Sequence, residues 1–101
     1  MKIVWTFFIY ALIKNFQNLE PATISIISGD PFYSYKYAEA KNFKNIEPQI
    51  IEGIGKDFKD SFEYAKKVGF KNIPKPIYDR IKNSSVFPKD ATVQESFKRF
   101  R

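Results

Sequence analysis

The hydrophobic residues of this chain return in three similar blocks, each about 27 residues long. Every block has a long stretch rich in Tyr and Phe, then a turn marked by Pro, and then a short run of apolar residues. The apolar residues of the short run lie at positions i, i+1 and i+4, which fall on one face of a helix. They are Thr23, Ile24 and Ile27, then Ile50, Ile51 and Ile54, then Ile77, Tyr78 and Ile81. The pattern predicts two short helices in each block.

The three blocks are also related residue by residue. Segments 10–27, 37–54 and 64–81 align without gaps; the first two share ten of their eighteen positions and the last two share eight. Each segment opens with Tyr-Ala, has a Phe six residues after the Tyr, and then an Asn. A short helix pair cannot bury both of its faces alone, so stacked neighbours build one continuous core. The sequence therefore predicts units that pack against one another.

Polar, Pro and Gly residues mark where the predicted helices begin and end. Asp30 and Asp57, with Ser84 at the same repeat position, suit the N-cap of the longer helix, where a side-chain oxygen accepts from an otherwise unpaired backbone N–H. The shorter helices are expected to begin at Pro, which ends one helix and readily starts the next. The turns are Glu20-Pro21, Glu47-Pro48 and Pro74-Lys75-Pro76, and the expected C-terminal caps are Gly29, Gly55 and Gly69.

Two repeated residue types have more than one interpretation. The tyrosines either form an aromatic ladder on which bases stack or fill the core between helices with their hydroxyls at its edge; we favour the core. The asparagines either contact a ligand or serve the turn through left-handed geometry or helix capping; we favour the turn. The residues are Tyr10, Tyr37 and Tyr64, and Asn18, Asn45 and Asn72. Both favoured roles are structural.

These patterns predict an all-α fold in a single domain, residues 1–101, with little or no sheet. We expect about three and a half stacked helical hairpins in a solenoid-like array. The units are 3–29, 30–56 and 57–83, followed by an irregular segment and a capping helix in 84–101. Strands at Lys2–Ile13 and Thr23–Ile27 are the alternative, because both segments are rich in β-branched and aromatic residues. The repeat argues against strands, since Tyr10-Ala11 aligns with Tyr-Ala pairs in helical surroundings.

Composition supports a folded chain with one core. Hydrophobic residues make up 44% and aromatic residues 18%, and 101 residues suffice for one domain but not for two independent cores. The apolar run Ile3–Ile13 superficially resembles a signal peptide, but no small-residue cleavage site follows it, and it is too short to span a bilayer. We expect a buried first helix, with secretion or insertion into a membrane interface as the lesser alternative.

The phrase Asp-Pro-Phe-Tyr-Ser-Tyr-Lys-Tyr-Ala at residues 30–38, followed by Glu47-Pro48-x-Ile50-Ile51, resembles the short helical repeats in proteins of large bacteriophages and giant viruses. Those arrays alternate an Asp-x-x-x-Ser-Tyr-x-Tyr-Ala phrase with a Glu-Pro-x-Ile phrase. The resemblance covers about residues 8–83. It implies a viral origin, the cytoplasm of an infected host cell, and a binding role such as inhibition of a host enzyme or defence complex.

The residue types that most catalytic and metal sites need are absent or have structural explanations. The chain has no Cys and no His, which excludes disulfides, thiolate nucleophiles and most zinc sites. The carboxylates considered as catalytic candidates are Asp57, Asp60, Glu63, Glu47 and Glu52. Asp57 suits a cap, Glu63 a helix surface and Glu47 a Pro turn, and no phosphate-binding glycine loop accompanies them. We therefore predict no enzyme activity, no cofactor and no metal.

The formal net charge is +6, and the excess is uneven. Residues 1–35 contain two basic and two acidic residues, so the positive charge belongs to the rest of the chain. Such charge either contacts nucleic-acid phosphates or steers the protein towards an acidic partner; a solvated helix face without a role is the third alternative. The candidate basic patch consists of Lys66, Lys67, Lys71, Lys75, Arg80, Lys82, Lys98, Arg99 and Arg101.

The hydrophobic N-terminal end is the candidate protein interface. Trp5, Phe7 and Phe8 stand in a stretch that is more polar in the later units, and buried aromatic residues dominate many interfaces. We predict a non-catalytic interaction module whose N-terminal end meets a protein partner or a second copy, while the basic end supplies steering. A nucleic-acid-binding protein and a structural subunit of a larger assembly are the alternatives, and a membrane partner is not expected.

Overall fold

The computed structural model describes residues 3–83, which are helical and contain no strand. Six α-helices and one short 3₁₀ helix follow one another along this part of the chain. They are α1 (Ile3–Ile13), α2 (Pro21–Ser28), α3 (Pro31–Ala40), α4 (Pro48–Ile54), α5 (Phe58–Val68), η1 (Phe70–Asn72) and α6 (Lys75–Lys82). The all-α prediction is confirmed for the described residues, and the predicted irregular segment and capping helix lie outside them.

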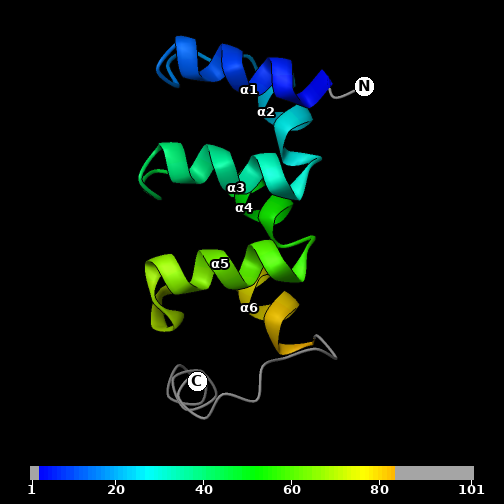
Figure 1. Cartoon of the computed structure of the whole chain (residues 1–101), viewed down its shortest axis with the longest axis vertical. Coiled ribbons are helices and arrows are strands. Elements are labelled where there is room, and N and C mark those ends of the chain that lie inside the picture. The colour runs from blue at the N-terminus through cyan, green and yellow to red at the C-terminus, as the bar shows by residue number, and fades with distance from the viewer. Residues whose placement is uncertain (1–2, 84–101) are drawn as a thin grey trace.

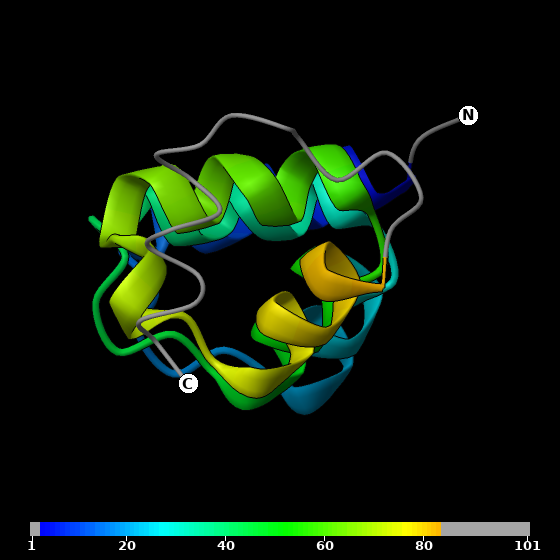
Figure 2. The same cartoon turned by 90° about the horizontal axis from the view of Figure 1, so that it is seen from below.

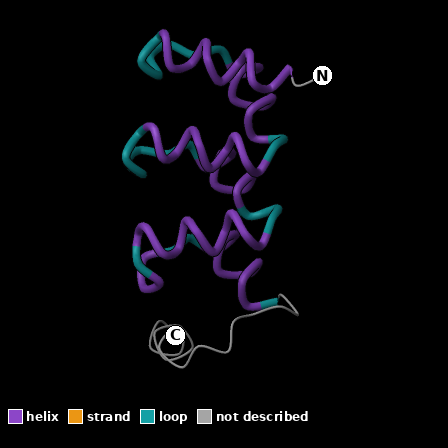
Figure 3. Tube along the Cα trace, in the orientation of Figure 1, coloured by secondary structure: helices purple, strands orange, loops and turns teal. Residues whose placement is uncertain are grey.

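The helices form two layers. Helices α1, α3 and α5 lie one above another, and the shorter α2, α4 and α6 lie behind them (Figure 1). Seen along the long axis, the longer helices overlap in one row and the shorter helices lie together on one side of that row (Figure 2). Turns within each pair gather at one edge, and the links between pairs lie at the other (Figure 3). We call α1 with α2 the first pair, α3 with α4 the second pair, and α5 with α6 the third pair.

Aspartate caps start the second and third of the longer helices. The Tyr33 backbone N–H donates to Asp30 Oδ1 at 3.1 Å, and the Asp60 N–H donates to Asp57 Oδ2 at 3.0 Å. Both predicted caps are confirmed, whereas Ser84 lies outside the described residues. The shorter helices begin at or beside their prolines, as predicted. The predicted C-terminal caps are confirmed at Gly29, Gly55 and Gly69.

The asparagine-containing turns are left-handed in the first two pairs and different in the third. Asn18 and Asn45 have φ angles of 52° and 54°, which confirms the left-handed geometry expected of them. In the third pair the positive φ, 94°, belongs to Gly69. Asn72 instead ends the 3₁₀ helix and donates from Nδ2 to the Val68 carbonyl oxygen at 2.9 Å. The same repeat position therefore has two backbone geometries.

The core lies between the two layers and is built from repeated positions. Fully buried are the alanine of each Tyr-Ala pair and the last isoleucine of each apolar stripe. They are Ala11, Ala38 and Ala65, with Ile27, Ile54 and Ile81. Tyr37 and Tyr64 are buried beside them, and Tyr10 is half-buried. The core role is therefore confirmed for the tyrosines of the second and third pairs, whose buried rings cannot stack on bases.

One phenylalanine joins the first pair to the second, and another joins the second pair to the third. Phe16 and Phe43 have φ angles of 60° and 59°, a left-handed geometry that costs a residue with a Cβ atom about 1–2 kcal/mol. From this geometry the Phe16 ring packs edge to face on Tyr37, with 5.0 Å between centroids, and the Phe43 ring packs on Tyr64 at 5.7 Å. Such ring contacts contribute about 0.5–1.5 kcal/mol beyond area burial, so they offset much of the backbone cost.

The first helix is far more exposed than the sequence predicts. Only Ala11 of α1 is fully buried, whereas Ile13 is 78% exposed, Ile3 60% and Trp5 53%. The prediction of a buried first helix is therefore wrong. Its cause is that, among the described helices, α1 packs on α2 and α3 alone, so the residues on its remaining sides are exposed. No helix in the described part of the chain is long and apolar enough to cross a bilayer.

Candidate protein-binding surfaces

The second pair contacts the first pair through one surface of α3 and α4. The Tyr33 ring of the second pair lies 5.6 Å from the Phe8 ring of the first, centroid to centroid. Beside it, the buried Ser34 hydroxyl donates to the Ile27 carbonyl oxygen at 2.9 Å. We call this surface of α3 and α4 the docking face; its residues are Tyr33, Ser34, Tyr37, Glu47, Gln49 and Ile50.

Polar donors and one glycine bring the end of α2 onto α4. Gln49 Nε2 donates to Ser25 Oγ at 3.0 Å, and Lys56 Nζ donates to the Ser28 carbonyl oxygen at 3.3 Å. A Cβ atom at Gly53 would collide with that same carbonyl oxygen. The second pair therefore accepts the carbonyl end of a helix through donors and through a position where only glycine fits.

The same six positions, one repeat earlier, line an open groove between α1 and α2. The groove has a volume of about 340 Å³ and is lined mainly by apolar side chains. Its residues are Thr6, Phe7, Tyr10, Glu20, Ala22 and Thr23, each 27 positions before a residue of the docking face. We call it the end groove. It opens to solvent where the docking face meets another helix pair.

The end groove lacks the polar groups that the docking face uses. The hydroxyl and amide donors are replaced by Phe7 and Ala22. The lysine donor is replaced by Gly29, and the glycine that admits a backbone carbonyl is replaced by Ile26. The first pair therefore presents a mainly apolar surface that lacks donors at these three positions.

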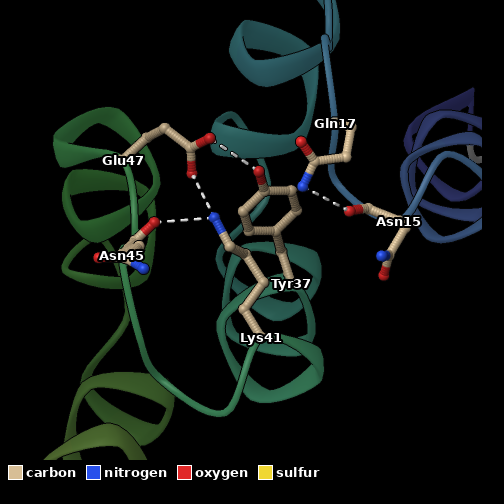
Figure 4. Close-up of polar contacts among 6 residues, drawn as sticks. All are labelled: Asn15, Gln17, Tyr37, Lys41, Asn45 and Glu47. Atoms are coloured by element: carbon tan, nitrogen blue, oxygen red, sulfur yellow. Dashed lines mark hydrogen bonds and ion pairs between the residues drawn. The ribbon is translucent and has the colours of Figure 1, made fainter.

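A tyrosine and a glutamate form the same hydrogen bond in the first two pairs. The Tyr37 hydroxyl donates to Glu47 Oε2 at 2.9 Å, and Lys41 Nζ lies 3.6 Å from Glu47 Oε1 (Figure 4). The Tyr10 hydroxyl lies 3.2 Å from both carboxylate oxygens of Glu20. Burial, helped by the Glu47 carboxylate, raises the pKa of Tyr37. The Tyr37 hydroxyl therefore stays protonated and acts as a structural donor to Glu47.

A polar hollow of about 450 Å³ lies between the turns of the first and second pairs. Gln17 Nε2 donates to the Asn15 carbonyl oxygen at 3.4 Å (Figure 4), and Lys41 Nζ donates to the Asn45 carbonyl oxygen at 2.8 Å. These bonds hold the turn backbones in place. Gln17 and Lys41 of the hollow therefore serve the turns.

The exposed side of the longer helices changes character along the molecule. Positions i, i+4, i+7 and i+8 of each longer helix fall on one face, away from its buried alanine. In α1 they are Trp5, Ile9, Leu12 and Ile13; in α3 Phe32, Lys36, Glu39 and Ala40; in α5 Lys59, Glu63, Lys66 and Lys67. We call these positions the outer stripe. It is apolar on α1, mixed on α3 and charged on α5.

The three aromatic residues predicted as one interface face different surroundings. Trp5 is exposed on the outer stripe, Phe7 lines the end groove, and Phe8 is half-buried with its ring on Tyr33. Sequence reasoning missed Ile13, which is more exposed than Trp5. The available signal was that α1 is apolar on all its sides, which leaves apolar side chains in water when the helix has few neighbours.

The predicted basic residues make different contacts in the described part of the chain. Lys66 and Lys75 each form an ion pair within their own helix, at 3.3 Å and 2.8 Å. Arg80 Nε donates to the Gly55 carbonyl oxygen at 2.7 Å and so joins α6 to the second pair. Lys67, Lys71 and Lys82 are exposed, and Lys98, Arg99 and Arg101 lie outside the described residues.

One carboxylate has a strongly perturbed pKa. Burial raises the pKa of Asp60 to about 6, and the neighbouring Asp57 carboxylate adds to the effect. Asp57 itself is occupied as the cap of α5. Among the described residues, no group of three or more His, Cys, Asp or Glu side chains could hold a metal ion. The Asp57–Asp60 pair therefore belongs to the start of α5.

No protein-family model, curated protein or solved structure matches the chain. Its surfaces are therefore the basis for a functional assignment. Two of them stand out from a normal solvated surface: the end groove, and the outer stripe with its apolar and basic ends. Both are open to solvent and are the candidate binding surfaces.

Proposed function

We propose that this chain is a non-catalytic protein-binding module made of stacked helical-hairpin repeats. The observation that carries the proposal is the outer stripe, which places Trp5, Leu12 and Ile13 in water at one end and lysines at the other. Tryptophan is a usual anchor of protein interfaces, contiguous exposed apolar residues mark interaction sites, and charged residues at a distance from them raise association rates.

Equivalent contacts in successive pairs support the repeat architecture. The Ser34 hydroxyl donates to the Ile27 carbonyl oxygen, and the Ser61 hydroxyl donates to the Ile54 carbonyl oxygen, 27 residues later, at 2.9 Å and 3.0 Å. Both bonds join the start of a longer helix to the end of the preceding shorter helix. A bond that recurs at the repeat spacing is what a solenoid-like array requires, because each unit meets only its neighbours.

The partner that fits the outer stripe is a protein surface with an apolar region beside an acidic one. The apolar region covers Trp5 and Ile13, and the acidic region faces the lysines of α5. With neighbouring helix axes about 10 Å apart, the two ends of the stripe are roughly 20 Å apart. An interface of standard size spans that distance. Nucleic acid fits less well, since phosphates gain nothing from the apolar half.

The resemblance to viral helical repeats supports a role inside an infected host cell. A short, basic chain that covers an acidic surface of a host enzyme or defence complex blocks that surface without chemistry of its own. We therefore place the chain in the host cytoplasm and assign it an inhibitory binding role, with the outer stripe as the contact surface.

A paired capture experiment tests this proposal. Tagged protein is incubated with host lysate, with and without nuclease, and the bound proteins are identified by mass spectrometry. The variant Trp5→Ala with Ile13→Ala should lower capture of a stoichiometric partner at least tenfold, because hot-spot residues each contribute more than about 1 kcal/mol. Lys66→Gln with Lys67→Gln should slow association and weaken its dependence on salt.

The control is Glu52→Gln, an exposed change on α4, in the layer of shorter helices. Unchanged circular dichroism and melting temperature verify that each variant is folded. Capture that persists in the Trp5 and Ile13 variant would exclude the outer stripe as the contact surface. Capture that disappears with nuclease would instead assign the lysines of the third pair to nucleic acid, the second candidate function.

A further inference from the structure

We propose that the end groove is a self-association surface through which two copies of the chain pair head to head about a two-fold axis. This inference goes beyond the proposed partner binding, because it uses a different side of α1. The outer stripe faces away from the core, whereas the end groove faces along the stack, opposite to the second pair. Both surfaces can therefore be occupied at once.

The first argument is the correspondence between the end groove and an interface that the chain already uses. Tyr33, Ser34 and Tyr37 of the docking face are covered by the first pair. No helix pair packs on their counterparts in the end groove among the described residues. The same end of the second and third pairs is covered by the preceding pair, which favours another protein chain as the occupant of the end groove.

The second argument excludes a helix pair docked in the manner seen within the chain. In that manner the Ile27 and Ser28 carbonyl oxygens reach the next pair and accept from Ser34 and Lys56. A pair placed on the end groove in the same way would direct its carbonyl oxygens at apolar side chains without a donor. Such buried, unpaired carbonyls are strongly disfavoured.

Side-chain size adds to the missing donors. Gly53 lies where the docking face meets the Ser28 carbonyl, and a Cβ atom there would collide with it. Ile26 occupies the corresponding position on the first pair, is exposed and carries no donor, unlike Arg80 of the third pair. Head-to-tail addition of a second copy would therefore place a bulky apolar side chain against a backbone carbonyl, and open-ended polymers are not expected.

Head-to-head pairing avoids both difficulties. Two end grooves bring the sides of helices together, and the sides have no free backbone carbonyls to satisfy. In such an isologous contact, each copy supplies the same apolar surface to the other. Glu20, which accepts from the Tyr10 hydroxyl, lines the groove and is exposed in the single chain; the proposed contact leaves its carboxylate at the edge, in water.

Charge distribution favours the same orientation. The chain carries +6, yet its first 35 residues have Lys2 and Lys14 balanced by Glu20 and Asp30. Two copies that meet at their neutral ends place their positive ends as far apart as the stack allows. Any other mutual orientation brings like charges closer, which opposes association at moderate salt.

Molar mass in solution is the primary test. Light scattering after size exclusion, at micromolar to hundred-micromolar concentrations, should give twice the chain mass of 11.9 kDa. Thr6→Arg and Ala22→Arg each bury two charges at the two-fold contact and should raise the dimer dissociation constant at least tenfold. Ala40→Arg, the same change on an exposed residue of α3, is the matched control and should leave the dimer intact.

Cysteine cross-linking tests the symmetry of the contact. Because the chain has no Cys, a disulfide in a single-cysteine variant can form only between the introduced residues of two copies. Thr6→Cys or Ala22→Cys should form a disulfide-linked dimer under mild oxidation, whereas Ala40→Cys should not. Mixing Thr6→Cys with Asn83→Cys distinguishes orientations, since a head-to-tail contact alone would link these two variants to each other.

Several results would overturn the proposal. A monomer throughout the concentration range would refute self-association, and a series of larger species or a Thr6→Cys with Asn83→Cys product would establish head-to-tail assembly. A dimer unaffected by both arginine variants would place the contact elsewhere. The outcome is separable from that of the proposed function, because Trp5→Ala with Ile13→Ala leaves the end groove unchanged and Thr6→Arg leaves the outer stripe unchanged.

Discussion

The end groove of the first pair and the docking face of the second pair occupy the same six repeat positions but accept different neighbours. The docking face offers a hydroxyl, an amide and a lysine to the carbonyl end of a helix, with Gly53 admitting the backbone. The end groove offers apolar side chains and Ile26 at the glycine position. The comparison teaches that the repeat sets where a face lies, and that side chains decide what binds to it.

The third pair extends the comparison. Asp60 occupies the position of Tyr33, and Arg80 that of Gly53. Arg80 carries a long side chain where Gly53 has none, and its guanidinium donates to the Gly55 carbonyl oxygen at 2.7 Å. A side chain at this position of a docked pair therefore supplies a donor in the third pair, whereas Ile26 of the first pair has none.

Exchanging glycine and isoleucine between the two faces should have the largest effect. Gly53→Ile introduces a Cβ atom that collides with the Ser28 carbonyl oxygen, so we expect a loss of about 3 kcal/mol or more in the free energy of unfolding. The reverse change, Ile26→Gly, affects an exposed helix position and should cost less than about 1 kcal/mol. Chemical denaturation measures both, and equal costs would contradict the close backbone approach at Gly53.

Removing the tyrosine hydroxyls should have an intermediate effect that differs between the faces. Tyr37→Phe leaves the Glu47 carboxylate without its 2.9 Å donor in a partly buried site, so we expect a loss of about 1–2 kcal/mol. Tyr10→Phe removes a longer bond to the exposed Glu20 and should cost at most about 0.5 kcal/mol. Thermal unfolding of the two variants compares their losses in the free energy of unfolding. A larger loss for Tyr10→Phe would reverse the assignment of the covered and open faces.

The smallest effect is expected from the carboxylate that replaces Tyr33 in the third pair. The folded-state pKa of Asp60 is raised to about 6 from an ordinary value of 3.8, so the folded chain binds a proton more tightly than the unfolded chain. Its contribution to stability is complete below about pH 4 and is lost as the pH rises through 6. Asp60→Asn should remove this decline.

The expected gain at neutral pH is modest, because Asp60 is partly in contact with water. A rise in melting temperature of roughly 2 °C at pH 7, with almost none at pH 4, corresponds to less than about 1 kcal/mol. Glu52→Gln, at an exposed carboxylate of α4, is the matched control. A gain of equal size at both pH values would mean that the Asp60 carboxylate does not titrate as described.

Much of the local structure was predictable because it depends on residues close in sequence. The caps at Asp30 and Asp57 bind an N–H three residues away, and the turn at Asn18 needs only a residue that tolerates left-handed geometry. The third turn was not predictable from the repeat, since Gly69 takes the positive φ and leaves Asn72 in a 3₁₀ helix. Here a single glycine changed the backbone conformation of the turn.

The amino-acid sequence by itself determined the helices, their order, their caps and the apolar stripes that face the core, because these follow from hydrogen bonds and periodicities within a few residues. Only the tertiary structure decided that Trp5 and Ile13 face water while Phe8 packs on Tyr33. It alone also placed the six residues of the end groove together. The physical reason is that α1 is apolar on every side, so its own pattern cannot distinguish the sides; the neighbouring helices decide which ones are covered.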